Sequence, residues 1–316
     1  MLKTLVIYES KYGSTQEVAG WLSLLLGPAR LVGLHDLPAD YQANDFIIIG
    51  FPIYSEQIPY NIQQFIIANQ EWLQSKPVAL FCTCMHLGNG QRLLDDLKEL
   101  YLPAATTKAL SGKLDFDRLS SKDQELLVHF RQQTGNQIKS YNHLNPAQVL
   151  SWGIVLKELR DQYLHAAPAE QLKELIDKYL LTHHTCVLTT SSSLGNRGTP
   201  IEYSIWQEQI VLLSEGGEKF AHLLLNNMVS VSVFDDYQGI SSLAGLQLQG
   251  VATIVNHEHH DYFSFMQFRG INPEKLPVKL NMISIKPSKV ELLHHSLKTD
   301  GYSIRQIYRY PNQKER

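Results

Sequence analysis

Short apolar runs alternate with amphipathic stretches along the first half of the chain. The apolar runs lie at residues 5–8, 29–34, 45–54, 77–84 and 105–112, and helical spacing of apolar residues follows at 18–26, 61–73 and 90–102. Strands that are apolar on both faces, separated by helices, are typical of a parallel sheet covered on both sides. The pattern predicts an α/β doubly wound sheet with strand order 2-1-3-4-5. Two further helices are expected over 120–133 and 145–164.

The pattern changes after a proline and small-residue break at 165–171. A short helix is expected over 171–181, followed by strand-like runs at 185–190, 200–206, 209–214, 230–234, 246–255 and 281–293. A short helix at 221–227 and two polar segments, SSLGNRGT and SEGGEK, separate these runs. Short strands with turns between them favour an antiparallel barrel or sandwich. We therefore predict two domains, at residues 1–165 and 170–316.

Composition and charge restrict the partners and the cellular compartment expected for these domains. The 316 residues are 44% hydrophobic and 19% charged, with a formal net charge of −3, so no nucleic-acid or anionic-membrane partner is indicated. The three cysteines form neither a CxxC pair nor a disulfide framework, which fits a reducing compartment. No apolar run has the length of a membrane helix and none resembles a signal peptide. We expect a cytoplasmic protein without membrane insertion.

The first strand leads into a segment rich in hydroxyls, residues 10–15. In open α/β sheets, ligands bind beyond the carboxyl ends of the strands. Gly13 permits close backbone approach, while Ser10, Ser14 and Thr15 offer hydroxyl groups beside a helix N-terminus, which attracts phosphate. The alternative is a capping box, with Ser14 as N-cap and Glu17 at the third helical position.

Two later loops are expected at the same edge of the sheet. GFPIYSEQIP (50–59) carries an apolar and aromatic tip, and TCMHLGNG (83–90) carries two glycines that free its backbone. A phosphate site, an apolar wall and exposed amide groups together suit flavin mononucleotide (FMN). The three loops therefore predict a flavin site.

These segments resemble the flavodoxin fold, and more closely the menaquinone-dependent protoporphyrinogen oxidase branch. The resemblance rests on TLVIYESKYGSTQEVA, YQANDFIIIGFPIYSEQIP and the long segment 112–145, and it covers residues 1 to about 165. It implies that the FMN phosphate is held by Ser10, Tyr12, Gly13, Ser14 and Thr15. It also implies that the ring is flanked or edged by Pro52, Ile53, Tyr54, Ser55, Thr83, His86, Gly88 and Gly90. Tyr12 stands where the usual flavodoxin loop has threonine.

The second half resembles the FMN-binding split barrel of the pyridoxamine 5′-phosphate oxidase class. The resemblance rests on TCVLTTSSSLGNRGTPIEYSIW, QIVLLSEGGEKFAHLLLNNMVSVSVF and GLQLQGVATIV. The Ser214 hydroxyl, the free amides of two glycines and the charge of Lys219 at a helix start together favour an anion site. The alternative is a solvated turn. The resemblance assigns that site to a flavin phosphate, and places Thr199, Pro200 and Ile201 near the ring. It also implies a homodimer with flavin between the subunits.

Other polar clusters have simpler explanations. NHEHHDYF (256–263) lacks zincin spacing, so a polar helix start is preferred to a metal site and no metal is expected. Cys82 and Cys84 share one face of a strand, and buried core cysteines are preferred to a redox pair. Asp115, Asp117 and Arg118 either line a substrate pocket or belong to a solvated loop.

The sequence thus predicts an FMN-dependent oxidoreductase or electron-transfer flavoprotein with up to two FMN per chain. A small molecule or a redox protein is the expected partner, and no residue is assigned a catalytic role. One alternative is a barrel that binds haem or another tetrapyrrole, with the first domain as its reductase or scaffold. Another is a first domain without flavin, and a third is a deazaflavin in the barrel.

Overall fold

The computed structural model describes residues 2–134 and 139–311. The chain divides into two compact units, Met1–Leu164 and His165–Arg316. The domains and the 112–145 segment expected from the sequence extend over residue 1 and residues 135–138 and 312–316, which lie outside the described residues. Within the described parts of the chain, no helix combines the length and apolarity needed to cross a membrane.

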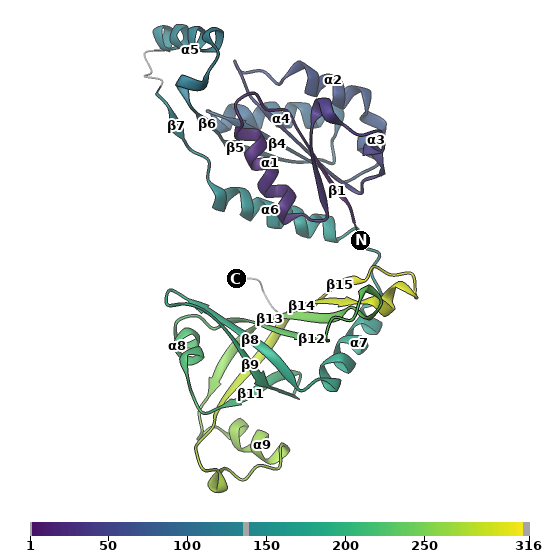
Figure 1. The fold of residues 1–316 in the computed structure, drawn as a ribbon, viewed down its shortest axis with the longest axis vertical. Coiled ribbons are helices and arrows are strands. Elements are labelled where there is room, and N and C mark those ends of the chain that lie inside the picture. The colour runs from purple at the N-terminus through teal and green to yellow at the C-terminus, as the bar shows by residue number, and fades with distance from the viewer. Residues whose placement is uncertain (1, 135–138, 312–316) are drawn as a thin grey trace. The chain divides into compact units, whose positions relative to one another are not determined.

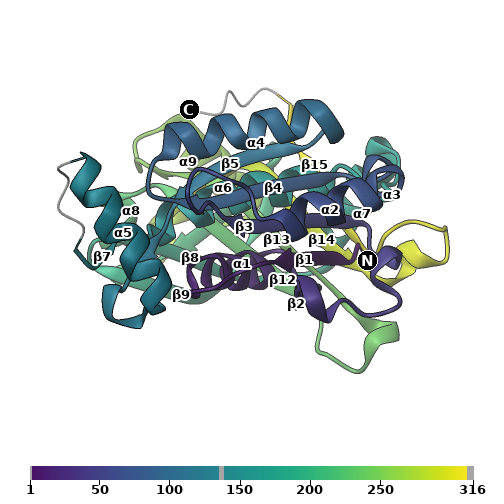
Figure 2. The same ribbon diagram turned by 90° about the horizontal axis from the view of Figure 1, so that it is seen from above.

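A five-stranded parallel sheet forms the centre of the first unit (Figure 1). Its strands are, in spatial order, β2 (Ala29–Gly33), β1 (Thr4–Tyr8), β3 (Phe46–Pro52), β4 (Val78–Cys84) and β5 (Thr106–Ser111). The order 2-1-3-4-5 can be followed across the sheet in Figure 2 and confirms the predicted fold class. Since all five strands run the same way, their carboxyl ends meet at one edge, where ligands of such sheets bind.

Alternation along the strands supplies two apolar faces. Leu5, Ile49 and Leu80 lie in one cluster, which includes residues of α2 (Tyr60–Ala68), α3 (Gln70–Gln74) and α4 (Leu87–Tyr101). The opposite face is covered by α1 (Ser14–Leu25) and α6 (Pro146–Asp161). The single helix expected over 61–73 is two helices, which meet at Asn69.

A buried arginine fastens α6 to the end of α1. Arg160 is 4% exposed, and its guanidinium donates to the carbonyl oxygens of Leu26 and Gly27, the latter at 3.1 Å, and to the Thr4 hydroxyl at 3.2 Å. The carbonyls at a helix C-terminus carry partial negative charge, so the cation is well placed. This contact holds α1 in position over the sheet.

The segment between β5 and α6 forms a small substructure of its own. It consists of β6 (Lys113–Leu114), α5 (Ser121–Thr134) and β7 (Tyr141–Asn142), and β6 pairs with β7 in an antiparallel ribbon. Short 3₁₀ turns complete this unit at Leu34–Asp36, Tyr41–Ala43 and Phe116–Arg118.

The second unit is built on a curled antiparallel sheet. Its strands are, in spatial order, β10 (Ser204–Trp206), β11 (Gln209–Ser214), β14 (Asn281–His294), β13 (Ala244–Val255), β12 (Met228–Phe234), β8 (Thr185–Ser192) and β9 (Gly195–Glu202), with β15 (Arg305–Arg309) also paired to β14. The helices are α7 (Ala169–Thr182), α8 (Glu218–Leu225) and α9 (His260–Phe268), with 3₁₀ turns at Ile240–Ser242, Pro273–Lys275 and His295–Lys298. This half-barrel confirms the predicted antiparallel class.

Two local expectations for this unit are wrong. The segment 192–199 is not a loop, because β8 and β9 form a hairpin that pairs as far as Ser192 and Gly195. Its serines, glycines and Asn196 are typical of turns, yet their backbone groups continue the ladder. The sequence pattern also missed β15, a short strand on the edge of the sheet.

The close approach of β3 to the Phe81 ring gives a test of this packing. A Cβ atom on Gly50 would lie 2.1 Å from the Phe81 ring, whereas one on Gly20, within α1, would meet nothing within 4 Å. We expect Gly50→Ala to lower the free energy of unfolding by about 1–3 kcal/mol through overpacking. Gly20→Ala should instead raise it by about 0.5–1 kcal/mol, because alanine is the better helix former. Denaturant unfolding measures both, and an unchanged Gly50→Ala protein would contradict this packing.

Candidate functional site

Helix α1 begins at the carboxyl end of β1 without a side-chain cap. Its N-cap is Gly13, whose φ of 91° is left-handed, and among the described residues no side chain caps the amides of the first turn. The capping box is therefore wrong, since Ser14 is the first helical residue. Among the described residues, no hydrogen bond uses the amides of Ser14, Thr15 or Gln16. Three free donors at the positive end of a helix dipole could form an anion site.

The hydroxyl groups expected to hold a phosphate already have partners. Ser10 Oγ accepts from the Gly13 amide at 3.0 Å, and Ser14 Oγ donates to the Lys113 carbonyl and accepts from the Lys113 amide at 3.0 and 3.1 Å. Thr15 and Thr83 share a buried hydroxyl–hydroxyl bond of 2.8 Å. A phosphate at this position would therefore be bound chiefly by main-chain amides.

The α5 segment contacts the loop before α1. The Tyr12 hydroxyl accepts from the Ser120 amide at 3.1 Å and bonds to the Asp123 carboxylate, which also pairs with the Lys11 ammonium. The hydrogen bonds to Asp123 lower the pKa of its carboxyl group, and the one from Lys11 has the largest effect. The carboxylate neutralises Lys11, so this lysine adds little charge to the anion site.

The aromatic tip of the second loop lies beside the first. Pro52 ends β3, and the Ile53 amide donates to the Thr83 carbonyl at 3.0 Å. The Tyr54 ring meets the Tyr12 ring edge-on, with centroids 6.3 Å apart. Ser55 follows in a turn with positive φ.

The third predicted loop is the start of a helix. His86 is the N-cap of α4, so Gly88 and Gly90 lie in its first turn rather than in an open glycine-rich strip. A Cβ atom on Gly90 would lie 2.5 Å from Cys84 Sγ and 3.0 Å from Cys82 Sγ. This glycine therefore lets α4 approach two buried free cysteines, and the predicted shared face of those cysteines is confirmed.

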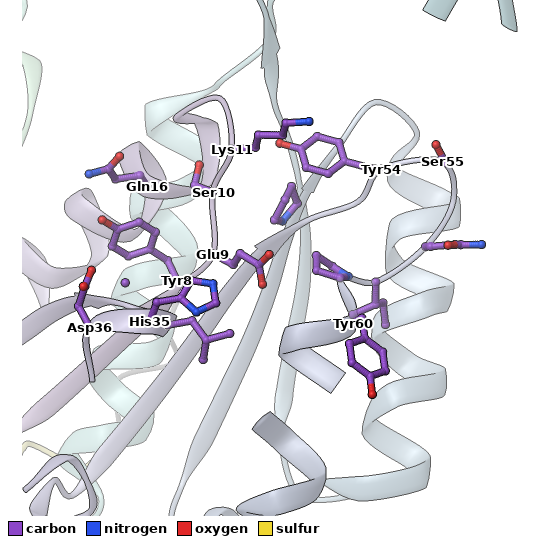
Figure 3. Close-up of a pocket in the computed structure, with 16 residues that line it drawn as sticks. Tyr8, Glu9, Ser10, Lys11, Gln16, His35, Asp36, Tyr54, Ser55 and Tyr60 are labelled. Carbon is purple, nitrogen blue, oxygen red and sulfur yellow. The ribbon is translucent and has the colours of Figure 1, made fainter. Parts of the chain in front are cut away.

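A cleft of about 680 Å³ opens at the carboxyl ends of β1, β2 and β3 (Figure 3). Of the residues predicted to surround a flavin, Ser10, Pro52, Tyr54 and Ser55 line it. Thr83, His86, Gly88 and Gly90 belong to the β4 side and do not line this cleft. The structure thus joins the first two loops in one cavity, and connects them to β4 through Thr15 and Thr83.

A second hollow of about 410 Å³ lies between the loop before α1 and the β6–β7 ribbon. Asp115, Arg118 and Tyr12 line it, but Asp117 does not. Tyr141 closes one side, and burial raises its pKa to about 12. The predicted substrate-pocket residues are therefore only partly brought together.

In the second unit, Lys219 folds back onto the turn before α8. Gly216 and Gly217 have φ values of 148° and 107°, and Ser214 Oγ bonds to both the amide and the carbonyl of Gly216. Lys219 is 7% exposed and its ammonium donates to the Gly216 carbonyl. Burial, and then nearby Arg197, lowers the pKa of Lys219. A buried cation with one neutral partner is a suitable counter-charge for an anion.

Sequence reasoning missed two buried polar residues of this unit, of which His222 lies on the same helix as Lys219. Thr190 and His222 are 0% and 1% exposed, and Thr190 Oγ1, His222 Nε2 and Thr199 Oγ1 are buried without a partner among the described residues. His222 lies one turn after Lys219 on α8, and its Nδ1 bonds to Ser192 Oγ at 2.8 Å. The i, i+3 spacing of a lysine and a histidine on a short amphipathic helix was the available signal.

The predicted ring contacts in this unit are only partly assembled. Thr199 pairs with Leu188 and Ile201 with Cys186, so both point toward the core. Pro200, between them, is exposed on the opposite face. Orphaned polar atoms inside the sheet nevertheless fit a bound polar group, because such atoms are nearly always satisfied.

The histidine-rich segment begins a helix, as expected. His259, His260 and Asp261 place their potential ligand atoms within 4.8 Å of one another. His259 is the N-cap of α9 and its Nδ1 accepts from the Asp261 amide at 3.2 Å, so one of the three is already used.

Residues 5–140 match the model of the flavodoxin domain. Three solved structures of low identity are similar to part of the chain. They are a Listeria innocua protein named after pyridoxamine 5′-phosphate oxidase (19% identity, 39% of this chain, 98% of that chain, TM-score 0.33), the heme storage protein HutZ of Vibrio cholerae (17%, 37%, 90%, 0.32) and an FAD-binding protein of Mycobacterium smegmatis (17%, 39%, 93%, 0.30). Comparison with curated proteins finds no match. The domain match indicates a flavin-related redox function for the first unit.

The buried Thr15–Thr83 pair can be tested by a double-mutant cycle. Either Thr15→Val or Thr83→Val leaves one buried hydroxyl unpaired, so each should lower the free energy of unfolding by about 1–3 kcal/mol. The double variant should lose less than the sum of the two, since it removes both polar groups. Denaturant unfolding gives the coupling energy, and strictly additive losses would show that the two hydroxyls do not interact.

Proposed function

We propose that this chain is an FMN-dependent oxidoreductase with a phosphate site at the start of α1 and a second at the start of α8. The observation that carries the proposal is the uncapped α1, whose three free amides stand in a domain that matches flavodoxin. FMN, when bound, supplies reversible electron transfer; the protein's part is to bind, orient and shield it.

In the first unit, the amides of Ser14, Thr15 and Gln16 would hold the phosphate. The Ile53–Ser55 loop would flank the ring, and the first turn of α4, from Leu87, would present its amides to the ring's polar edge. Both helix starts face the same edge of the parallel sheet, which supports their sharing one ligand.

In the second unit, Lys219 would leave the Gly216 carbonyl and pair with a phosphate. Thr190, Thr199 and His222 would form with the phosphate the hydrogen bonds that their buried atoms lack.

With both sites filled, the fusion would hold two redox centres at high effective concentration. Electrons would then pass between a small-molecule substrate and a second partner. We place this activity in the cytoplasm.

FMN titration of the full-length apoprotein tests both sites. About two FMN should bind per chain. Gln16→Glu should weaken one class of site by about tenfold, because it sets a carboxylate beside the free amides. Lys219→Met should weaken the other class by at least as much.

Matched controls separate these effects from general damage. Gln148→Glu places the same charge at the third position of α6, where Asn145 already caps the amide, and Lys286→Met removes an exposed lysine from β14. Neither should change FMN affinity. If one FMN binds per chain and only Lys219→Met weakens its binding, the first unit would be a scaffold that holds no flavin. No FMN binding would overturn the proposal and favour the tetrapyrrole alternative, which a Soret band on haem titration would report.

We also propose that the second unit forms a homodimer. Leu194, Leu224, Leu225 and Met228 are 65%, 78%, 60% and 53% exposed, on α8 and on strand ends beside it. Exposed apolar side chains gathered on neighbouring elements are typical of association surfaces.

Sedimentation velocity tests this association. Leu224→Glu should shift the protein from dimer to monomer, since it places a charge in the apolar patch. Leu24→Glu, on α1 of the first unit where the leucine is 83% exposed, should leave the mass unchanged. A monomeric unmodified protein would contradict the homodimer.

A further inference from the structure

The cleft at the ends of β1, β2 and β3 has a wall that the flavin proposal does not use. His35 and Asp36, which follow β2, form this wall, and Tyr60 lies across from it. Leu34, Ile58 and Pro59 also line the cleft. Between the two walls stands Glu9, the first residue after β1 (Figure 3). These residues are candidates for a separate ligand.

The Glu9 carboxylate reaches into this space without a partner. Figure 3 shows its oxygens in the cleft, between His35 and the Tyr54–Tyr60 side. Its Oε2 atom is buried and has no hydrogen-bond partner among the described residues. Glu9 as a whole is half-buried. A carboxylate oxygen only accepts hydrogen bonds, and leaving that one buried oxygen unpaired carries a cost. A ligand with a positive charge or an N–H group would remove that cost.

The surroundings of Glu9 favour a positive charge. The rings of Tyr8, Tyr54 and Tyr60 line the cleft, and the faces of aromatic rings attract cations. Asp36 adds a second carboxylate, while the ammonium of Lys11 pairs with Asp123. These carboxylates would repel a phosphate from the part of the cleft beside them, although Gln16, whose amide is one of the three free donors of α1, also lines the cleft.

A strained turn forms the lip of the cleft. Ser55 and Glu56 have φ values of 49° and 58°, and the Gln57 amide donates to the Tyr54 carbonyl at 3.0 Å. Residues with side chains seldom adopt positive φ, and such strain clusters at ligand sites. The turn holds Tyr54 at the opening.

We propose that this cleft binds a planar organic cation, with the Glu9 carboxylate as its counter-charge and the tyrosine rings against its flat faces. The prolines Pro52 and Pro59 also line the cleft and add flat apolar contacts. Binding of such a cation requires no flavin. A cation held there would nevertheless lie next to the loops proposed to flank one, as a substrate or redox partner must.

Isothermal titration of the full-length protein with two matched probes tests the charge. 1-Methylnicotinamide is a planar pyridinium cation, and nicotinamide is its neutral counterpart of nearly the same shape. The cation should bind about tenfold more tightly than the neutral probe. Equal affinities, or no binding of either at millimolar concentration, would overturn the proposal.

Two variants assign the effect to Glu9. Glu9→Gln should abolish the preference for the cation, while Glu71→Gln, which removes an exposed carboxylate on α3 that does not line the cleft, should preserve it. A preference that survives Glu9→Gln would contradict the assignment. If Glu9→Gln does not fold, Tyr60→Ala decides, because Tyr60 is 71% exposed and its loss should weaken cation binding several-fold. FMN content measured on the same preparations separates failure of this site from failure of the flavin proposal.

Discussion

The hydrogen bond between the hydroxyls of Thr15 and Thr83 connects the elements that the candidate site of the first unit requires. Thr15 lies in the first turn of α1 and Thr83 near the end of β4, with β3 between their strands. Both hydroxyls are buried, so each must have a partner. Their bond holds the start of α1 toward β4, while the Ile53 amide binds the Thr83 carbonyl from the other side. One residue on β4 thereby positions two loops.

The β5–α6 segment determines how the loop before α1 can recognise a ligand. Its Lys113 backbone takes up the Ser14 hydroxyl, and its Ser120 and Asp123 take up that of Tyr12. The length of the Tyr12 side chain lets its hydroxyl reach Ser120 and Asp123. Because these side-chain hydroxyls already have hydrogen-bond partners, a ligand would be bound by main-chain amides, whose positions depend on backbone geometry.

The helix-covered parallel sheet could be predicted because burial on both faces leaves continuous apolar runs, as in β3 and β4. The strand order followed from the topology that doubly wound sheets of this kind share. Local boundaries were harder. Gly88 and Gly90 have the composition of a loop, but Gly90 is small so that α4 can pack on Cys82 and Cys84, a contact that the composition of the segment does not reveal. Likewise, nothing in the sequence around Thr190 or Glu9 distinguishes these residues from others of their type. Only the packing around them shows that their oxygen atoms lack partners.

The two proposed phosphate sites differ in the source of their positive potential. Beside α1, Lys11 and Lys113 are paired with Asp123 and Glu17, so an anion there meets peptide dipoles of fractional charge. Beside α8, Lys219 is buried against a neutral carbonyl, and burial, followed by the charge of Arg197, lowers its pKa. An anion would supply a counter-charge to the buried lysine, so the second site gains more from a doubly charged phosphate than the first. The cleft around Glu9 has the opposite charge, because an unpaired carboxylate favours a cation rather than an anion.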